Sequence, residues 1–176
     1  MLYKNIILKN SALTLLDIFF DNPTKEFHAR ELSRNTNLSI FAVLDAIKSL
    51  AKAGFVSVHS KGNLKIVKAE HSTKFIRSKR VRNLEKIYNS GIVDYLNDTY
   101  GIPEAIVLFG SYSRGDDVEK SDIDIGVVTK SHKELNLEKF EKLLSRKISV
   151  HEIDLKKISR EFHSNLSNGI VMEGAL

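Results

Sequence analysis

The sequence contains no cysteine, and this absence removes several kinds of chemistry. Without thiols, disulfides, thiolate zinc sites and cysteine nucleophiles are excluded. A chain without cysteine suits a reducing compartment, so we expect a cytoplasmic protein. No GxxxxGK[ST] pattern occurs either, which excludes a phosphate-binding loop of the Walker type.

Long apolar runs are also missing. No stretch approaches the roughly 20 apolar residues that a membrane-spanning helix needs. The apolar start is interrupted by Lys9 and Asp17 and has no small-residue cleavage site, so we expect neither a signal peptide nor a membrane partner. Proline is scarce, and Pro23 and Pro103 stand where we expect joints between elements.

The net charge of +5 is unevenly distributed. Residues 1–70 hold ten Lys/Arg against six Asp/Glu, and residues 71–100 hold six against three. Residues 101–176 reverse the balance, with eleven against thirteen. A basic front and a mildly acidic rear suggest polyanion contact in front and cation handling behind, although excess lysine can also serve solubility alone.

Residues 1–70 show helical spacing followed by strand alternation. The pattern predicts helices over 8–21 and 39–53, a short helix between them, and a β-hairpin over 55–67 whose turn contains Gly62. The apolar face of helix 39–53 is expected to hold Ile40, Val43, Leu44, Ile47 and Leu50. This order of elements resembles a winged helix-turn-helix domain.

The winged-helix resemblance implies contact with double-stranded DNA. Helix 39–53 would enter the major groove, and the hairpin would follow the phosphates. The residues expected to take part are Ser39, which also suits the helix N-cap, and Lys48, Lys52, Lys61, Lys65 and Lys68. Because this helix has few base-reading groups, docking to a protein or formation of a homodimer is the alternative use of the domain.

Residues 71–100 are expected to connect two domains. Residues 70–90 predict an amphipathic helix with Phe75, Ile76, Val81, Leu84 and Ile87 on its apolar face and Lys79 among its polar residues. From residue 101 strands and helices alternate, with strands over 105–109, 122–129 and 148–155 and helices over 132–145 and 156–168. We therefore expect a two-domain α+β protein whose rear domain, 101–176, is a small mixed sheet with helices on one face.

The residues that carry chemistry lie between the first two of these strands. Gly110 and Ser111 follow a continuous apolar strand, where close backbone approach and exposed N–H groups suit a phosphate, and Arg114 lies one turn further on. Ten residues separate Ser111 from Asp122, and Asp122 and Asp124 fall on one face of the next strand. Two carboxylates at this spacing repel each other unless a cation lies between them, and Mg²⁺ is commonly held by carboxylates and substrate phosphates.

This Gly-Ser, ten-residue spacer and Asp-x-Asp arrangement resembles the polymerase-β-like nucleotidyltransferase superfamily, and residues 101–176 resemble its minimal branch. The resemblance implies that Gly110 and Ser111 hold a triphosphate of an NTP, such as ATP, and that Asp122 and Asp124 bind Mg²⁺ or Mn²⁺. Some members of this branch are fused to winged-helix domains, and others are antitoxins that attach AMP to a HEPN-type partner toxin, so a partner protein is one acceptor it suggests.

The family also places a third carboxylate on a later strand. Strand 148–155 offers three candidates, and its alternation leaves them open. If Ile148 and Val150 face the helices, His151 faces the site, whereas Glu152 or Asp154 reaches it if a bulge shifts the strand. The sequence thus predicts a metal-dependent nucleotidyltransferase that moves a nucleoside monophosphate onto a hydroxyl. The alternative is a non-catalytic DNA-binding regulator or antitoxin whose rear domain binds nucleotide or a partner.

Overall fold

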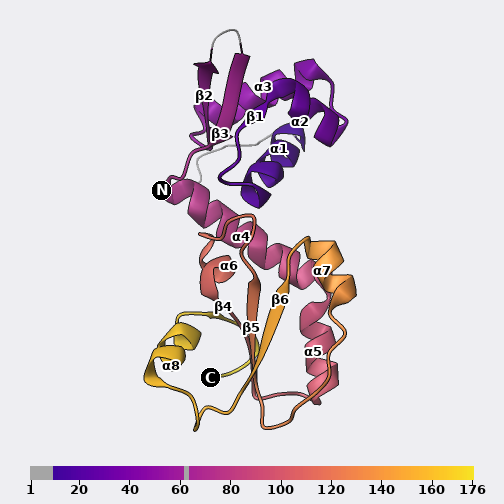
Figure 1. Cartoon of the computed structure of the whole chain (residues 1–176), viewed down its shortest axis with the longest axis vertical. Helices are drawn as coiled ribbons and strands as arrows, with labels where there is room; N and C mark the ends of the chain where they lie inside the picture. Colours follow the sequence, from indigo (N-terminus) through magenta and orange to yellow (C-terminus); the bar gives the residue numbers. More distant parts are fainter. Residues whose placement is uncertain (1–9, 62–63) are drawn as a thin grey trace. The chain divides into compact units, whose positions relative to one another are not determined.

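The computed structural model describes residues 10–61 and 64–176. The expected helix start at 8–9, the turn residue Gly62 and the side chain of Lys61 lie outside this description. The contacts divide the chain into two compact units, Met1–Ile76 and Arg77–Leu176, each with its own small sheet (Figure 1). The boundary falls inside one long helix, and the division into 1–70, 71–100 and 101–176 stays a prediction. None of the helices in the described part of the chain is long and apolar enough to cross a bilayer.

The first unit contains three helices and a three-stranded antiparallel sheet of order β1-β3-β2. Its elements are α1 (Asn10–Asp21), β1 (Phe27–His28), α2 (Ala29–Thr36), α3 (Ile40–Lys52), β2 (Val56–Lys61), β3 (Leu64–Ala69) and the start of α4 (Thr73–Ser90). The two-residue strand β1 is too short for an alternation pattern and was not expected. The helix-and-hairpin order is the one that the sequence predicts.

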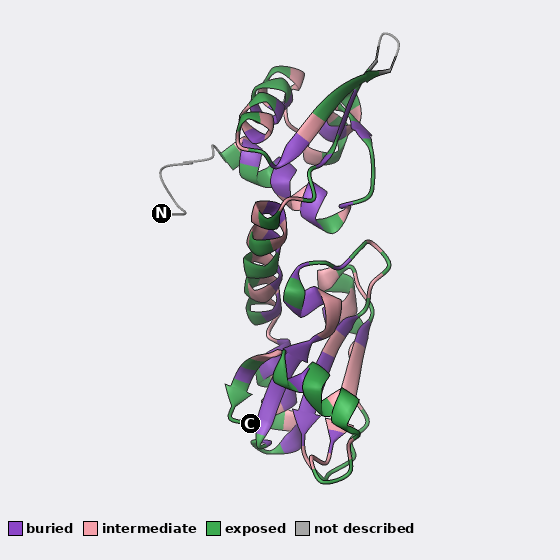
Figure 2. Cartoon of the chain, turned by 90° about the vertical axis from the view of Figure 1, so that its left-hand side faces the viewer, coloured by how far each residue is buried: buried purple, intermediate pink, exposed green. Residues whose placement is uncertain are grey.

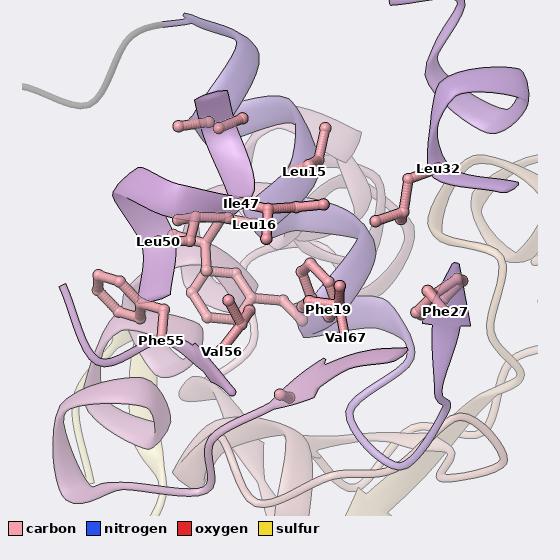
Figure 3. Packing of buried hydrophobic residues seen from close by; sticks show 14 of the residues in the cluster. Leu15, Leu16, Phe19, Phe27, Leu32, Ile47, Leu50, Phe55, Val56 and Val67 are labelled. Atoms are coloured by element: carbon pink, nitrogen blue, oxygen red, sulfur yellow. The ribbon is translucent and has the colours of Figure 1, made fainter. Parts of the chain in front are cut away.

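Apolar residues from every element of this unit pack into one core. Phe19 of α1 meets Phe27 of β1 edge to face, with ring centroids 5.5 Å apart, and Leu50 of α3 is fully buried in the same cluster (Figure 3). Ser39 caps α3 as expected, because its hydroxyl accepts a hydrogen bond from the Ala42 N–H at 3.2 Å. The core residues therefore fix α1, α2 and α3 against the hairpin.

One expectation for the face of α3 is wrong. Leu44 is 47% exposed, whereas Val43, Ala46, Ile47 and Leu50 form the buried stripe. At about 100° per residue, position 44 lies nearly a third of a turn away from the centre of that stripe. Leu44 therefore belongs to the outward surface of α3.

The second unit is built on a four-stranded mixed sheet of order β6-β5-β4-β7. Strand β4 pairs antiparallel with β5 and β7, and β5 pairs parallel with β6. Its elements, after the rest of α4, are α5 (Ile92–Tyr100), β4 (Ala105–Phe109), α6 (Gly110–Arg114), β5 (Ile123–Val128), α7 (Glu138–Leu144), β6 (Ile148–Ile153), α8 (Arg160–Ser167) and β7 (Ile170–Gly174). The mixed sheet agrees with the sequence, but the helices expected over 132–145 and 156–168 are shorter.

Helices cover both faces of this sheet, which corrects the expectation of helices on one face. Ile106 and Leu108 of β4 pack on one side with residues of α4, α5 and α7, and Ala105 and Val107 pack on the other with Leu166 of α8. All five residues of β4 are buried, and buried strand residues appear in purple in Figure 2. A strand that is apolar at every position needs cover on both faces, and α8 supplies the second cover.

Candidate functional site

The turn after β4 brings backbone close to a carboxylate. Gly110 has φ of +72°, and Phe109 and Asp124 are register partners across β4 and β5. A Cβ added at Gly110 would overlap the Asp124 carboxylate oxygen and lie 3.2 Å from its Cγ. The positive φ favours glycine, and a methyl group here would have to displace the Asp124 carboxylate, so Gly110 permits the placement of Asp124.

The short helix α6 closes this turn through its own polar groups. Ser113 is buried and its hydroxyl donates to the Gly110 carbonyl at 2.9 Å, while the Gly115 N–H donates to the Ser111 carbonyl at 2.9 Å. Ser111 itself is half-buried at the start of α6. Arg114 is largely exposed, and its Nε donates to Asp116 at 3.1 Å. Of the expected phosphate-binding residues, Gly110 thus lies against Asp124, Ser111 follows it at the start of α6, and Arg114 pairs locally with Asp116.

Strand β5 presents the two aspartates on one side and isoleucines on the other. Ile123 and Ile125 are buried, Asp124 is 31% exposed on its side chain, and Asp122 is exposed one residue before the strand. Alternation therefore places Asp124 on the face of β5 that Gly110 approaches, and the same alternation, continued one residue before the strand, predicts Asp122 on that face.

The pairing of β6 with β5 shows which of His151, Glu152 and Asp154 faces Asp124. The parallel register of β5 and β6 is regular, with Asp124 beside Ser149 and Gly126 beside His151. His151 therefore lies on the Asp124 face, and its Nε2 is 3.6 Å from Asp124 Oδ1. The imidazole also packs against two phenylalanine rings, Phe109 at 5.4 Å and Phe162 at 6.0 Å between centroids.

Glu152 is not brought to Asp124, because its neighbour His151 already occupies that face. Its carboxylate accepts hydrogen bonds from Tyr100 Oη at 2.7 Å, from the Lys133 N–H at 2.8 Å and from His132 Nδ1. Burial alone would raise the pKa of Glu152, but these three hydrogen bonds outweigh it and lower the pKa. Burial, followed by the Glu152 carboxylate, raises the pKa of Tyr100. Glu152 thus stabilises the segment that follows β5 and does not take part in the Asp124 site.

Asp154 lies beyond the end of β6 and is also apart from Asp124. It lines a cavity of about 540 Å³ together with Val128 and Thr129, at the opposite end of β5 from Asp124. Hydrogen bonding from the Lys156 N–H lowers the pKa of Asp154. The bulge that would bring Glu152 or Asp154 to the aspartates does not occur in β6.

A buried charged cluster supports the loop between Gly110 and Asp122. Lys79 of α4 and Asp117 are both buried, with Lys79 Nζ 3.0 Å from Asp117 Oδ2. Asn83 Nδ2 donates to Asp117 Oδ1 at 2.8 Å and to the Tyr112 carbonyl at 2.9 Å. Arg146 also approaches Asp117, at 3.7 Å. The cluster fixes the spacer that separates the glycine turn from the aspartates.

The sequence interpretation missed this cluster by misplacing one face of α4. Lys79 and Asn83 are buried, whereas Val81, expected on the apolar face, is 63% exposed. The buried positions Phe75, Lys79, Asn83 and Ile87 recur every fourth residue, as one helix face requires. A lysine and an asparagine at that spacing between two apolar residues were the available signal.

The donor set on the Asp124 face fits a divalent cation shared with a nucleotide. Asp122 and Asp124 supply carboxylate oxygens, and Mg²⁺ is commonly bound by one or two carboxylates plus substrate phosphates. Across residues 10–61 and 64–176, no group of three or more His, Asp or Glu side chains is arranged to hold a metal alone. Phosphate oxygens and water would have to complete the coordination.

The expected DNA-contact residues of the first unit are partly brought together. Lys48 and Lys52 are exposed one turn apart on α3, beside Phe41, which is 81% exposed. Lys65 and Lys68 are exposed on β3 but three residues apart, so they point to opposite faces. Ser39 serves as the cap of α3. The side chain of Lys61 lies outside the described part of the chain.

The buried pair makes a stability prediction. Replacing Asp117→Asn leaves the buried ammonium of Lys79 without its carboxylate, and we expect the free energy of unfolding to fall by about 3–5 kcal/mol in urea titrations. The matched control is Asp116→Asn, because Asp116 is an exposed neighbour in a surface pair with Arg114, and its loss is expected to stay within about 1 kcal/mol. Equal losses in the two variants would contradict the role given to the cluster.

Two solved structures are similar to part of this chain. The adhesin competence repressor of Streptococcus pyogenes is 19% identical over 55% of this chain and 69% of its own, with a TM-score of 0.40. A protein described as a possible transcriptional regulator from Methanosarcina mazei Go1 is 17% identical over 52% of this chain and 78% of its own, with a TM-score of 0.37. These TM-scores are too low to establish a shared fold.

No curated protein gave a match to the sequence. The sequence of the rear unit matches a known family. Residues 90–175 match the family model described as a nucleotidyltransferase domain, and this match supports the place of that segment in the nucleotidyltransferase superfamily.

Proposed function

We propose that the unit from Arg77 onward is a metal-dependent nucleotidyltransferase that transfers a nucleoside monophosphate, with AMP from ATP as the first candidate, to an acceptor hydroxyl. The observation that carries the proposal is the Asp124 carboxylate against Gly110, at the point where β4 ends and beside the start of β5. The family match over residues 90–175 supports the same chemistry.

The proposed reaction forms one bond and breaks another at the α-phosphorus. The acceptor oxygen attacks and its proton passes to solvent water, while the bond from the α-phosphorus to the bridging oxygen breaks and pyrophosphate leaves with that oxygen. A bound Mg²⁺ or Mn²⁺ would supply charge stabilisation for the attacking and leaving oxygens. Asp122 and Asp124 would hold the cation, and Gly110 would let the phosphates approach the backbone.

The remaining residues of the turn would orient the triphosphate. The Ser111 hydroxyl at the start of α6 would donate to a phosphate oxygen, and the Arg114 guanidinium, exposed beside Asp116, would add positive charge. The acceptor class favoured by the resemblance to antitoxins is a hydroxyl of a partner protein. Its identity is not needed for the first test, because pyrophosphate release also reports turnover.

The transfer proposal predicts a specific loss in an isotope assay. We expect wild-type protein with α-³²P-labelled ATP and a divalent cation to release pyrophosphate and label an acceptor in cell extract. Asp122→Asn/Asp124→Asn should lower the rate at least 100-fold, because these carboxylates hold the cation that stabilises the transition state. The matched double variant Asp94→Asn/Asp98→Asn, with exposed carboxylates on α5, should keep the wild-type rate. Transfer that persists at the wild-type rate in Asp122→Asn/Asp124→Asn would contradict the assignment of these aspartates to the site.

A non-catalytic use of the same site is the second candidate. Among the described residues, no carboxylate from β6 faces Asp124, and His151 stands there instead. If turnover needs a carboxylate at that position, the unit would bind nucleotide or a partner protein without turnover. Nucleotide binding that depends on Asp122 and Asp124, together with no pyrophosphate release, is the result that would favour it.

For the first unit we propose a winged helix-turn-helix domain that binds duplex DNA. The element order from α1 to β3 and the antiparallel sheet β1-β3-β2 support this reading. Lys48 and Lys52 lie exposed on α3, where the second helix of such a motif meets the major groove. Phe41 and Leu44 on the same helix carry no base-reading hydrogen bonds, so phosphate contacts would dominate affinity.

The DNA proposal predicts a change in salt dependence. If Lys48 and Lys52 each neutralise one phosphate, Lys48→Gln/Lys52→Gln should reduce the slope of log K against log salt by about 2, measured by fluorescence anisotropy on a duplex. The control Lys120→Gln/Lys142→Gln removes two exposed lysines of the second unit and should leave the slope unchanged. An equal slope in wild type and the α3 variant would count against DNA contact by this helix.

A further inference from the structure

The Nε2 atom of His151 is a buried polar atom that makes no hydrogen bond with any described residue. The side chain as a whole is 41% exposed, so the burial is specific to this nitrogen. Buried polar atoms without a partner are rare, and an ion is one of the usual reasons for one. The nitrogen lies 3.6 Å from Asp124 Oδ1.

The surroundings of His151 hold its ring toward Asp124. Phe109 at the end of β4 and Phe162 of α8 pack on the imidazole, and the two phenylalanine rings also meet each other edge to face at 5.6 Å. The regular register of β5 and β6 fixes the strand position of His151 on the Asp124 face. The imidazole therefore has little freedom to turn its Nε2 elsewhere.

We propose that His151 and Asp124 bind the cation together, that the exposed side chain of Asp122 turns toward the cation only when it is bound, and that the nitrogen ligand makes the site prefer Mn²⁺ over Mg²⁺. The inference rests on the metal site of the proposed function and adds a ligand and a selectivity to it. Two ligands of one octahedral cation with bonds of about 2.1 Å lie about 3 Å apart. The 3.6 Å between Nε2 and Oδ1 is near that separation.

The selectivity follows from ligand chemistry. Mg²⁺ is a hard cation that takes oxygen ligands and loses its water reluctantly. Imidazole nitrogen suits transition-metal ions, while carboxylates suit Mg²⁺ and Mn²⁺ alike. A site with two carboxylates and one imidazole therefore gives Mn²⁺ an additional bond that Mg²⁺ uses poorly. A carboxylate at position 151 would remove this difference.

The test measures the metal directly rather than turnover. Full-length protein is titrated with Mn²⁺ in the presence of α,β-methylene-ATP, free Mn²⁺ is followed by electron paramagnetic resonance, and Mg²⁺ is added as competitor. We expect wild type to bind Mn²⁺ at least tenfold more tightly than Mg²⁺. His151→Ala should weaken Mn²⁺ at least tenfold and Mg²⁺ less than threefold. His151→Asp should restore tight binding with the preference shifted toward Mg²⁺.

A spectroscopic measurement identifies the ligand itself. Pulsed electron paramagnetic resonance of bound Mn²⁺ should show coupling to a directly bonded nitrogen, and labelling histidine with ¹⁵N should change that coupling. Labelling the protein separates it from the nitrogens of the nucleotide. Both variants should lose the histidine coupling while keeping the wild-type circular dichroism spectrum.

The outcomes separate this inference from the proposed function. Bound Mn²⁺ without histidine coupling, or a His151→Ala affinity equal to wild type, overturns the inference. If Asp122→Asn/Asp124→Asn still abolishes Mn²⁺ binding in that case, the proposed metal site stands with oxygen ligands alone. If wild type binds neither cation with the nucleotide analogue, both proposals fail together.

Discussion

The contact between the Asp124 carboxylate and the backbone of Gly110 sets the arrangement of the rear unit's candidate site. Across the antiparallel pair of β4 and β5, Asp124 lies beside Phe109. A Cβ at Gly110 would overlap the Asp124 carboxylate. Glycine takes the positive φ at this turn without strain, and this conformation directs the backbone into α6. Gly110, Asp124 and His151 of β6 are consequently grouped on one face of the sheet.

Charge burial next to this site has a structural role. The spacer between Ser111 and Asp122 has little regular structure, yet Asp117 within it is buried against Lys79 and Asn83 of α4. A buried ion pair adds little net stability relative to apolar packing, but it is costly to break. The arrangement therefore defines one conformation of the loop more than it stabilises the fold. Glu152 plays a comparable role at the other end of the sheet through Tyr100 and the Lys133 N–H.

Local patterns were sufficient to predict much of the fold. The spacing of Val43, Ile47 and Leu50 predicts α3, and the uniformly apolar residues 105–109 predict a buried strand. The same patterns predicted burial wrongly where a contact with a distant part of the chain determines it. Leu44 and Val81 are apolar but exposed, and Lys79 is charged but buried, because its partner Asp117 lies far along the chain. The cover of the sheet by α8 also depends on a long-range contact that a single strand does not specify.

The candidate site shows the same division. Strand alternation predicts that Asp122 and Asp124 share a face, and it predicts His151 there only if β6 pairs without a bulge. That register depends on pairing with β5, so the sequence left three candidates and the structure places His151 beside Asp124. His151 stands where the resemblance implied a carboxylate. The proposed choice of cation and the proposed turnover therefore depend on the same side chain.

The central claim is that the Gly110 turn and Asp124 form one nucleotide-binding feature. The most direct test is the affinity for α,β-methylene-ATP with a divalent cation, measured by calorimetry for wild type and Gly110→Ala. The account predicts at least a tenfold loss for Gly110→Ala, because a methyl group at this position displaces the Asp124 carboxylate. An unchanged affinity in a folded Gly110→Ala protein would contradict it.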